Sequence, residues 1–128
     1  MNQRLGKSYK LTRKTLINNI FAKGSKINSY PILLRYSLTS EHLPASFQIA
    51  FSVPKRNFKK AVDRNKVKRL LREVVRKNKG IIEKKSLQSE NKFTLFLIYT
   101  GKEIPDYDNL EISIQRVLKK LPSAKDND

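Results

Sequence analysis

The stretch from Lys55 to Lys79 constrains the fold most, because it combines dense positive charge with a helical apolar pattern. It contains 12 Lys and Arg residues and two acidic residues, a net charge of +10 within a chain of net charge +17. From Ala61 onward, apolar residues recur every three or four positions, and at about 100° per residue they share one stripe of a helix. The stretch therefore predicts an amphipathic helix that ends at Gly80, with one apolar and one cationic face. Residues 81–91 are expected to form a short helical continuation and a loop.

The cationic face of this helix indicates a polyanionic partner. After the first turn Glu73 is the one acid in the run, so few ion pairs can form within the helix. Rows of Lys and Arg neutralise phosphates and release counterions, which gives strong, salt-sensitive binding. A solvated basic face is the common alternative, but so one-sided a charge favours nucleic-acid binding. The residues expected to contact the nucleic acid are Arg64, Asn65, Lys66, Lys68, Arg69, Arg72 and Arg76.

Length and composition exclude several other classes of protein. A chain of 128 residues predicts one RNA-binding domain over 1–128, with flexible ends at about 1–10 and 123–128. No apolar run approaches the ~20 residues that span a bilayer, and no signal-peptide pattern is present. The absence of Cys is compatible with the cytoplasm. We therefore predict a cytoplasmic protein with no membrane partner and no obligate protein partner.

The order of apolar patterns predicts the α+β class, as a single-domain α/β sandwich in the order α-β-β-α-β-α. A mixed sheet of about four strands would pack against three helices. One strand, over residues 93–99, is an almost continuous apolar run, typical of a central strand buried on both faces. The other predicted elements are a helix from about Thr12 to Gly24, strands over 32–39 and 47–53, and a helix over 109–121.

Alternation along the strand over 32–39 places Leu34 and Tyr36 on one face, and Leu33 and Arg35 on the other. An aromatic ring on an open sheet face can stack a nucleotide base, which is worth about 1–3 kcal/mol. The alternative for Tyr36 is a half-buried core position with its hydroxyl in water. One face of the next strand is small and polar enough to floor a cleft, and it carries Gln48, Ala50 and Ser52.

Acid–base or metal chemistry has few candidate residues in this sequence. Up to Lys79 the acids are Glu41, Asp63 and Glu73. Asp63 and Glu73 are about 15 Å apart along one helix, too far to share a metal or a proton. The single histidine, His42, lies in a polar loop with no other ligand nearby in sequence. We therefore expect no catalytic residue and no metal site in the protein alone.

The segment from Ala61 to Glu73, AVDRNKVKRLLRE, resembles the A-V-x-R-N-x-x-K-R-x-x-R-E signature of the bacterial ribonuclease P protein subunit. The Arg-Asn-Arg core of that signature is Arg64-Asn65-Lys66 here, which keeps the charge but not the bidentate phosphate recognition of its last Arg. The preceding FSVPKR is similar to the family's strand that ends in a basic pair. The resemblance extends from about residue 11 to about residue 121.

The resemblance implies that this protein assists a catalytic RNA, which removes the 5′ leader of precursor tRNA by Mg²⁺-dependent hydrolysis. The basic helix would face the catalytic RNA, and a cleft beside the sheet would hold the single-stranded leader. A short extra strand near 25–29 and a left-handed β-α-β crossover are also implied, although right-handed crossovers are the default. For Phe21, core and cleft-wall positions both fit the sequence. The implied leader-binding residues are Ile17, Phe21, Leu34, Tyr36, Ser52 and Lys55.

Two other functions are compatible with the composition. A ribosomal or other structural RNA-binding protein would show the same charge, but the spacing from Arg64 to Glu73, together with Tyr36 and Phe21, favours ribonuclease P. A DNA-binding helix in the major groove is a weaker alternative. No second helix precedes the basic one at turn spacing, and no dimerisation heptads occur.

Overall fold

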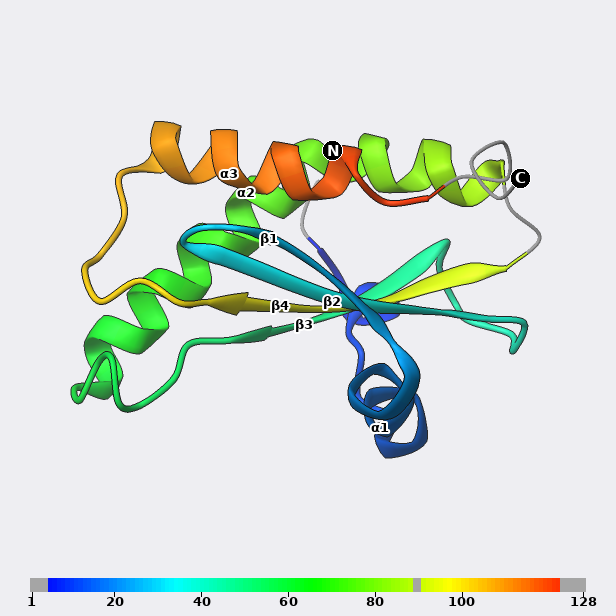
Figure 1. Cartoon of the computed structure of the whole chain (residues 1–128), viewed down its shortest axis with the longest axis horizontal. Coiled ribbons are helices and arrows are strands. Elements are labelled where there is room, and N and C mark those ends of the chain that lie inside the picture. Colours follow the sequence, from blue (N-terminus) through cyan, green and yellow to red (C-terminus); the bar gives the residue numbers. More distant parts are fainter. Residues whose placement is uncertain (1–4, 89–90, 123–128) are drawn as a thin grey trace.

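The computed structural model describes residues 5–88 and 91–122, which form a mixed sheet with helices on both faces (Figure 1). One helix, α1, lies below the sheet in this view, α3 lies above it, and α2 rises from the lower left to the upper right, where it lies beside α3. This arrangement confirms the α+β class and includes the extra short strand β1. The elements are a 3-10 turn at Lys7–Tyr9, α1 (Lys14–Lys23), β1 (Ser25–Ser29), β2 (Ile32–Thr39), β3 (Phe47–Ser52), α2 (Ala61–Leu87), β4 (Lys92–Tyr99) and α3 (Tyr107–Lys119).

The strand order within the sheet is β1-β2-β4-β3. β2 is antiparallel to both β1 and β4, whereas β3 is parallel to β4. The long helix α2 connects β3 to β4, so these three elements form the expected β-α-β unit. The left hand of its crossover stays a prediction. β4 pairs on both sides, which agrees with the apolar run that predicted a central strand.

The face of the sheet toward α2 and α3, here called the core face, carries the main hydrophobic core. In register across the sheet, Leu34 of β2 lies beside Leu97 of β4, which lies beside Phe51 of β3. Leu34 and Leu97 are fully buried in this core. Tyr36 belongs to the same face, because it is two residues from Leu34. Its ring packs edge-on toward Phe93, with centroids 6.3 Å apart.

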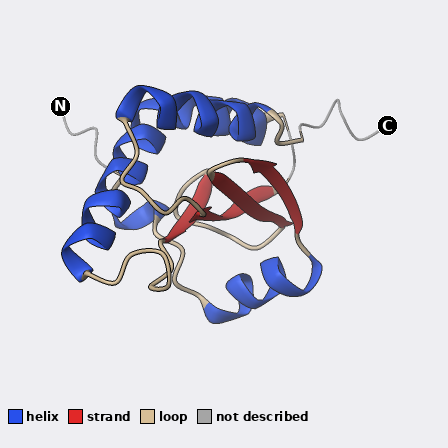
Figure 2. Cartoon of the chain, turned by 60° about the vertical axis from the view of Figure 1, so that its left-hand side comes forward, coloured by secondary structure: helices blue, strands red, loops and turns tan. Residues whose placement is uncertain are grey.

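The opposite face, here called the α1 face, is covered in part by α1 (Figure 2). Its core is smaller, with Leu11, Leu16, Ile20 and Leu43 buried together. Ile17 packs against this second cluster and is half-buried. The strand residues that belong to the α1 face include Leu33, Arg35, Gln48, Ala50, Ser52, Phe96 and Ile98.

The helix boundaries differ from the prediction at two points. α1 begins at Lys14, two residues after the predicted start at Thr12. α2 continues through Gly80 and ends at Leu87, because it still has apolar surface to bury, including the fully buried Ile82. Burying such a side chain contributes about 1.5–3 kcal/mol, more than the ~1 kcal/mol that Gly costs within a helix.

Gly24 ends α1 as predicted, and packing explains why this residue is Gly. A Cβ at this position would lie 2.3 Å from the carbonyl oxygen of Ile20 and 2.6 Å from that of Tyr36. The end of α1 therefore approaches the backbone of β2 too closely for any side chain. This contact positions α1 on its face of the sheet.

Residues 5–11, here called the strap, pack along the edge of β3. The sequence predicts that 1–10 belong to a flexible arm, but the strap makes defined contacts. The Leu11 amide donates to the Ile49 carbonyl at 3.1 Å, and the Gln48 side-chain amide donates to the Ser8 carbonyl at 3.1 Å. The rest of the predicted flexible ends, 1–4 and 123–128, lies outside the described residues, and the single domain stays a prediction.

Within the described ranges, none of the helices combines the length and the apolar character that crossing a membrane requires.

Candidate nucleic-acid interface

Helix α2 has the amphipathic character that the sequence predicts. Its apolar stripe packs against the sheet and α3, and Val67 and Leu71 are fully inaccessible to solvent. Its outer face carries Asn65, Lys66 and Arg69, all exposed to solvent. Lys68 and Arg72 lie on the flank of the helix nearer to β3, where they line a pocket. The predicted RNA-binding residues thus divide between two surfaces of one helix.

Arg64 is partly occupied by contacts within the protein. Its guanidinium donates to the carbonyl oxygens of Phe58, at 2.8 Å, and Lys59, at 3.1 Å. These bonds hold the loop that leads into α2. The sequence left Phe58 unassigned, and the structure buries its ring beside Tyr99, with centroids 6.1 Å apart. Replacing Arg64 would therefore disturb this loop as well as remove a charge.

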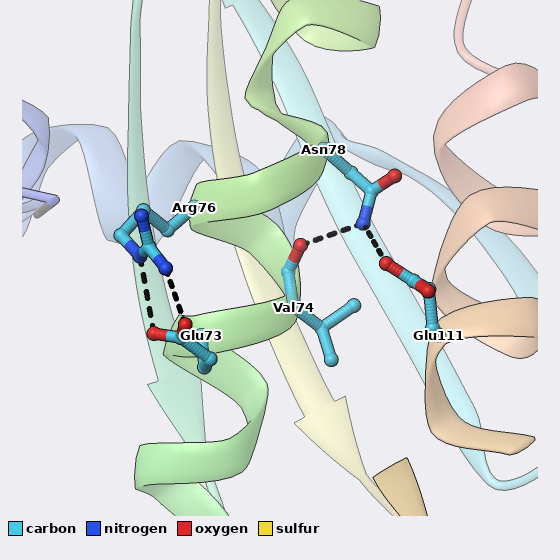
Figure 3. A network of polar contacts seen from close by, with 5 residues as sticks. All are labelled: Glu73, Val74, Arg76, Asn78 and Glu111. Atoms are coloured by element: carbon cyan, nitrogen blue, oxygen red, sulfur yellow. Dashed lines mark hydrogen bonds and ion pairs between the residues drawn. The ribbon is translucent and has the colours of Figure 1, made fainter. Parts of the chain in front are cut away.

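Arg76 forms an ion pair with Glu73 on the outer side of α2 (Figure 3). Its Nε atom donates to Glu73 at 3.0 Å, and its Nη2 atom contacts the other carboxylate oxygen. The hydrogen bond and charge of Arg76 lower the pKa of Glu73, and Glu73 raises the pKa of Arg76. Glu73 thus neutralises Arg76, one of the cations on the outer side of α2.

The opposite side of α2 is tied to α3 by Asn78 (Figure 3). The Asn78 side-chain amide donates to the Val74 carbonyl at 2.8 Å and to the Glu111 carboxylate at 2.9 Å. Gln115 of α3 donates back to the Asn78 oxygen at 2.9 Å. This network fixes the orientation of α2, so its cationic face is presented by a rigid element.

Replacing Glu73 by Gln is expected to lower stability slightly at neutral pH and to leave it unchanged in acid. The pKa of Glu73 is lower in the folded state, so its stabilisation is present above the unfolded pKa and is lost as pH falls through the folded pKa. Urea unfolding of both proteins across this pH range measures the effect. If the two proteins differed in free energy of unfolding by the same amount at every pH, the ion pair would not be the source of the difference.

On the α1 face, Phe21 and Arg35 form a partly exposed cluster. The Phe21 ring is 43% exposed and packs edge-on against Phe96, with centroids 5.0 Å apart. The Arg35 guanidinium lies 4.7 Å from the centroid of the Phe21 ring, within the range of a cation–π contact. Phe21 is therefore both a packing residue and an accessible one, and its place in a cleft wall stays a prediction.

Two predicted leader-binding residues lie on the other side of the sheet from this cluster. Leu34 is fully buried in the main core, so its assignment to a leader-binding surface is wrong. Tyr36 shares its face and packs against the same core, whereas Ser52 lies on the α1 face. The α1-face residues of β2 are instead Leu33 and Arg35. A change of one residue along a strand exchanges its two faces.

The described parts of the chain contain no group of three or more His, Cys, Asp or Glu side chains that could hold a metal ion. His42 is exposed in the loop before β3. Glu41, beside it, pairs with Arg13 at 2.9 Å, which leaves that carboxylate in an ordinary surface ion pair. The described residues therefore do not fit a metal centre.

The fold and the candidate interface define a small α+β protein with exposed cationic side chains on its long helix. The Ribonuclease P family model matches residues 5–122, so this chain belongs to the ribonuclease P protein family. Members of this family are the protein component of a ribonucleoprotein endoribonuclease that processes tRNA. The structural RNA-binding alternative is therefore not favoured.

Similar proteins support this assignment. The ribonuclease P protein component of Porphyromonas gingivalis is 34% identical over 117 residues, 91% of this chain and 85% of the relative. That of Chlorobaculum tepidum is 28% identical over 88% of this chain and 79% of the relative. The RNase P protein from Thermotoga maritima has a TM-score of 0.70 and 22% identity, covering 89% of this chain and 98% of that one. At this identity the structural likeness supports the fold alone.

Proposed function

We propose that this protein assists the RNA-catalysed removal of the 5′ leader from precursor tRNA by binding two RNAs on two surfaces. The outer face of α2 binds the catalytic RNA, and the α1 face binds the single-stranded leader. The observation that carries the proposal is that exposed cations on α2 and the partly exposed Phe21–Arg35 cluster lie on different faces of one fold. Mg²⁺ enters with the RNA. The cytoplasmic location stays a prediction.

The chemistry of the α1 face suits an unpaired leader. Single-stranded RNA is bound by stacking bases on planar side chains and by neutralising phosphates. Phe21 supplies an accessible ring and Arg35 a planar cation beside it. Lys55, exposed just beyond Ser52, supplies a further charge, and Ile17 adds apolar surface. Leu33 and Arg35 thus take the roles that the sequence assigned to Leu34 and Tyr36.

Replacing Arg35 by Ala is expected to weaken binding of precursor tRNA far more than binding of mature tRNA. The variant loses a stacking contact worth about 1–3 kcal/mol and one charge, and only the precursor carries a leader. The measurement is binding of leader-bearing and leaderless tRNA to the enzyme reconstituted with its RNA. The matched control is Tyr36→Phe on the core face, which should change neither affinity. Equal weakening of both tRNAs by Arg35→Ala would exclude the α1 face as the leader site.

The isolated protein is expected not to cleave precursor tRNA in Mg²⁺, but to lower the Mg²⁺ concentration that the catalytic RNA requires. The described residues contain no group of three or more His, Cys, Asp or Glu side chains that could hold a metal ion for such chemistry. Cleavage assays of protein alone, RNA alone and the mixture test this. Cleavage by nuclease-free protein alone would contradict the proposal.

A further inference from the structure

A cationic pocket of about 450 Å³ opens at the edge of β3, between the strap and α2. Four of its lining residues are basic and none is acidic. Lys7 and Lys10 belong to the strap, and Lys68 and Arg72 belong to α2. Like charges gathered in one pocket repel one another, and a bound anion relieves this repulsion. The composition of the pocket wall therefore points to an anionic ligand.

The strap wall of this pocket is held in place by specific contacts. The Tyr9 hydroxyl donates to Glu83 of α2 at 3.3 Å, and the Lys79 ammonium lies 5.1 Å from the centroid of the Tyr9 ring. The same ring packs 5.0 Å from the ring of Phe47 on β3. Tyr9 therefore anchors the strap to both α2 and β3. The two strap lysines belong to a preformed wall and not to a free arm.

The floor of the pocket offers a backbone donor as well. The Ile49 carbonyl points away from β4, since it accepts the Leu11 amide of the strap. Backbone groups alternate in direction along a strand, so the Phe51 amide, two residues on, points the same way. The Phe51 amide therefore points toward the strap edge of the sheet and not toward β4. The Arg72 guanidinium lies 6.0 Å from the Phe51 ring centroid, at the same end of the pocket.

We propose that this strap pocket binds a single phosphate group of the catalytic RNA and that the bound phosphate fastens the strap to α2. An outward amide and surrounding cations form the usual environment of a bound phosphate. Two of the four cations belong to the helix that faces the catalytic RNA, which favours that RNA over the leader. The inference rests on the proposed function only for the source of the phosphate.

Inorganic phosphate tests the pocket itself. It should raise the thermal midpoint of the wild-type protein and slow hydrogen exchange of the Leu11 amide, because a ligand that binds the folded state stabilises it. In the Lys7→Ala/Lys10→Ala variant both responses should be largely lost. The matched control is Lys102→Ala/Lys120→Ala, which removes the same charge from exposed positions elsewhere and should respond as wild type. A strap variant that responds as fully as the control would overturn the site.

Binding of the catalytic RNA at several salt concentrations tests the source of the phosphate. Loss of one phosphate contact should reduce the slope of log affinity against log salt by about one unit. We expect this one-unit change for Lys7→Ala/Lys10→Ala, because both lysines would contact the same phosphate, although the variant removes two charges. Normal RNA binding by this variant, despite a lost phosphate response, would overturn the assignment to RNA. Arg69→Ala, on the outer face of α2, tests the proposed function separately. If it weakens RNA binding and the strap variant does not, only the further inference fails.

Discussion

Replacing Leu34 by Ala is expected to lower the free energy of unfolding by about 2–5 kcal/mol, the usual cost of truncating a fully buried Leu. Leu34 is inaccessible to solvent and lies beside Leu97 in the main core. The matched variant is Leu33→Ala, one residue away on the half-exposed α1 face, where the same truncation removes less buried surface and should cost less. Urea unfolding of the two variants measures the difference.

The same two variants also test which face binds RNA. Under conditions in which both are folded, Leu33→Ala should weaken binding of leader-bearing tRNA and leave mature tRNA unaffected. Leu34→Ala should change neither affinity selectively, because its side chain cannot reach a ligand. If Leu34→Ala weakened leader binding selectively and Leu33→Ala did not, the leader would lie on the other side of the sheet.

Reversing two charges on the outer face of α2, as Lys66→Glu/Arg69→Glu, is expected to weaken binding of the catalytic RNA by at least about 100-fold. Both side chains are exposed, so the fold should be retained. A hydrogen bond to a charged group contributes about 1.5–3 kcal/mol, and two such contacts would be lost. The introduced carboxylates would also repel the RNA backbone. Affinity measured at several salt concentrations should show a reduced salt slope as well.

The control for this variant is Lys102→Glu/Lys120→Glu, which changes the net charge equally at exposed positions outside α2. It should weaken RNA binding only through the general loss of positive charge. Lys66 and Arg69 are better test positions than Arg64 or Arg76, whose guanidiniums already contact the protein. Similar losses in the two charge-reversal variants would mean that net charge, and not the outer face of α2, determines affinity.

The sequence by itself determined the local elements and the family. The helix beginning at Ala61, the strand over 32–39 and the central apolar strand follow from periodicities of 3.6 and 2 residues, which are properties of neighbouring positions. The spacing of Arg64, Asn65 and Arg72 was enough to indicate the ribonuclease P protein family. These features need no knowledge of what packs against each element.

Only the tertiary structure decided which side of each element remains accessible. Alternation in β2 separates Leu34 from Arg35, but the buried face depends on where α1, α2 and α3 pack. Likewise, α2 continues past Gly80 because Ile82 finds a place in the core. The strap packs on α2 because Tyr9 meets Glu83, 74 positions away. Such contacts join residues far apart in the chain, so no local pattern encodes them.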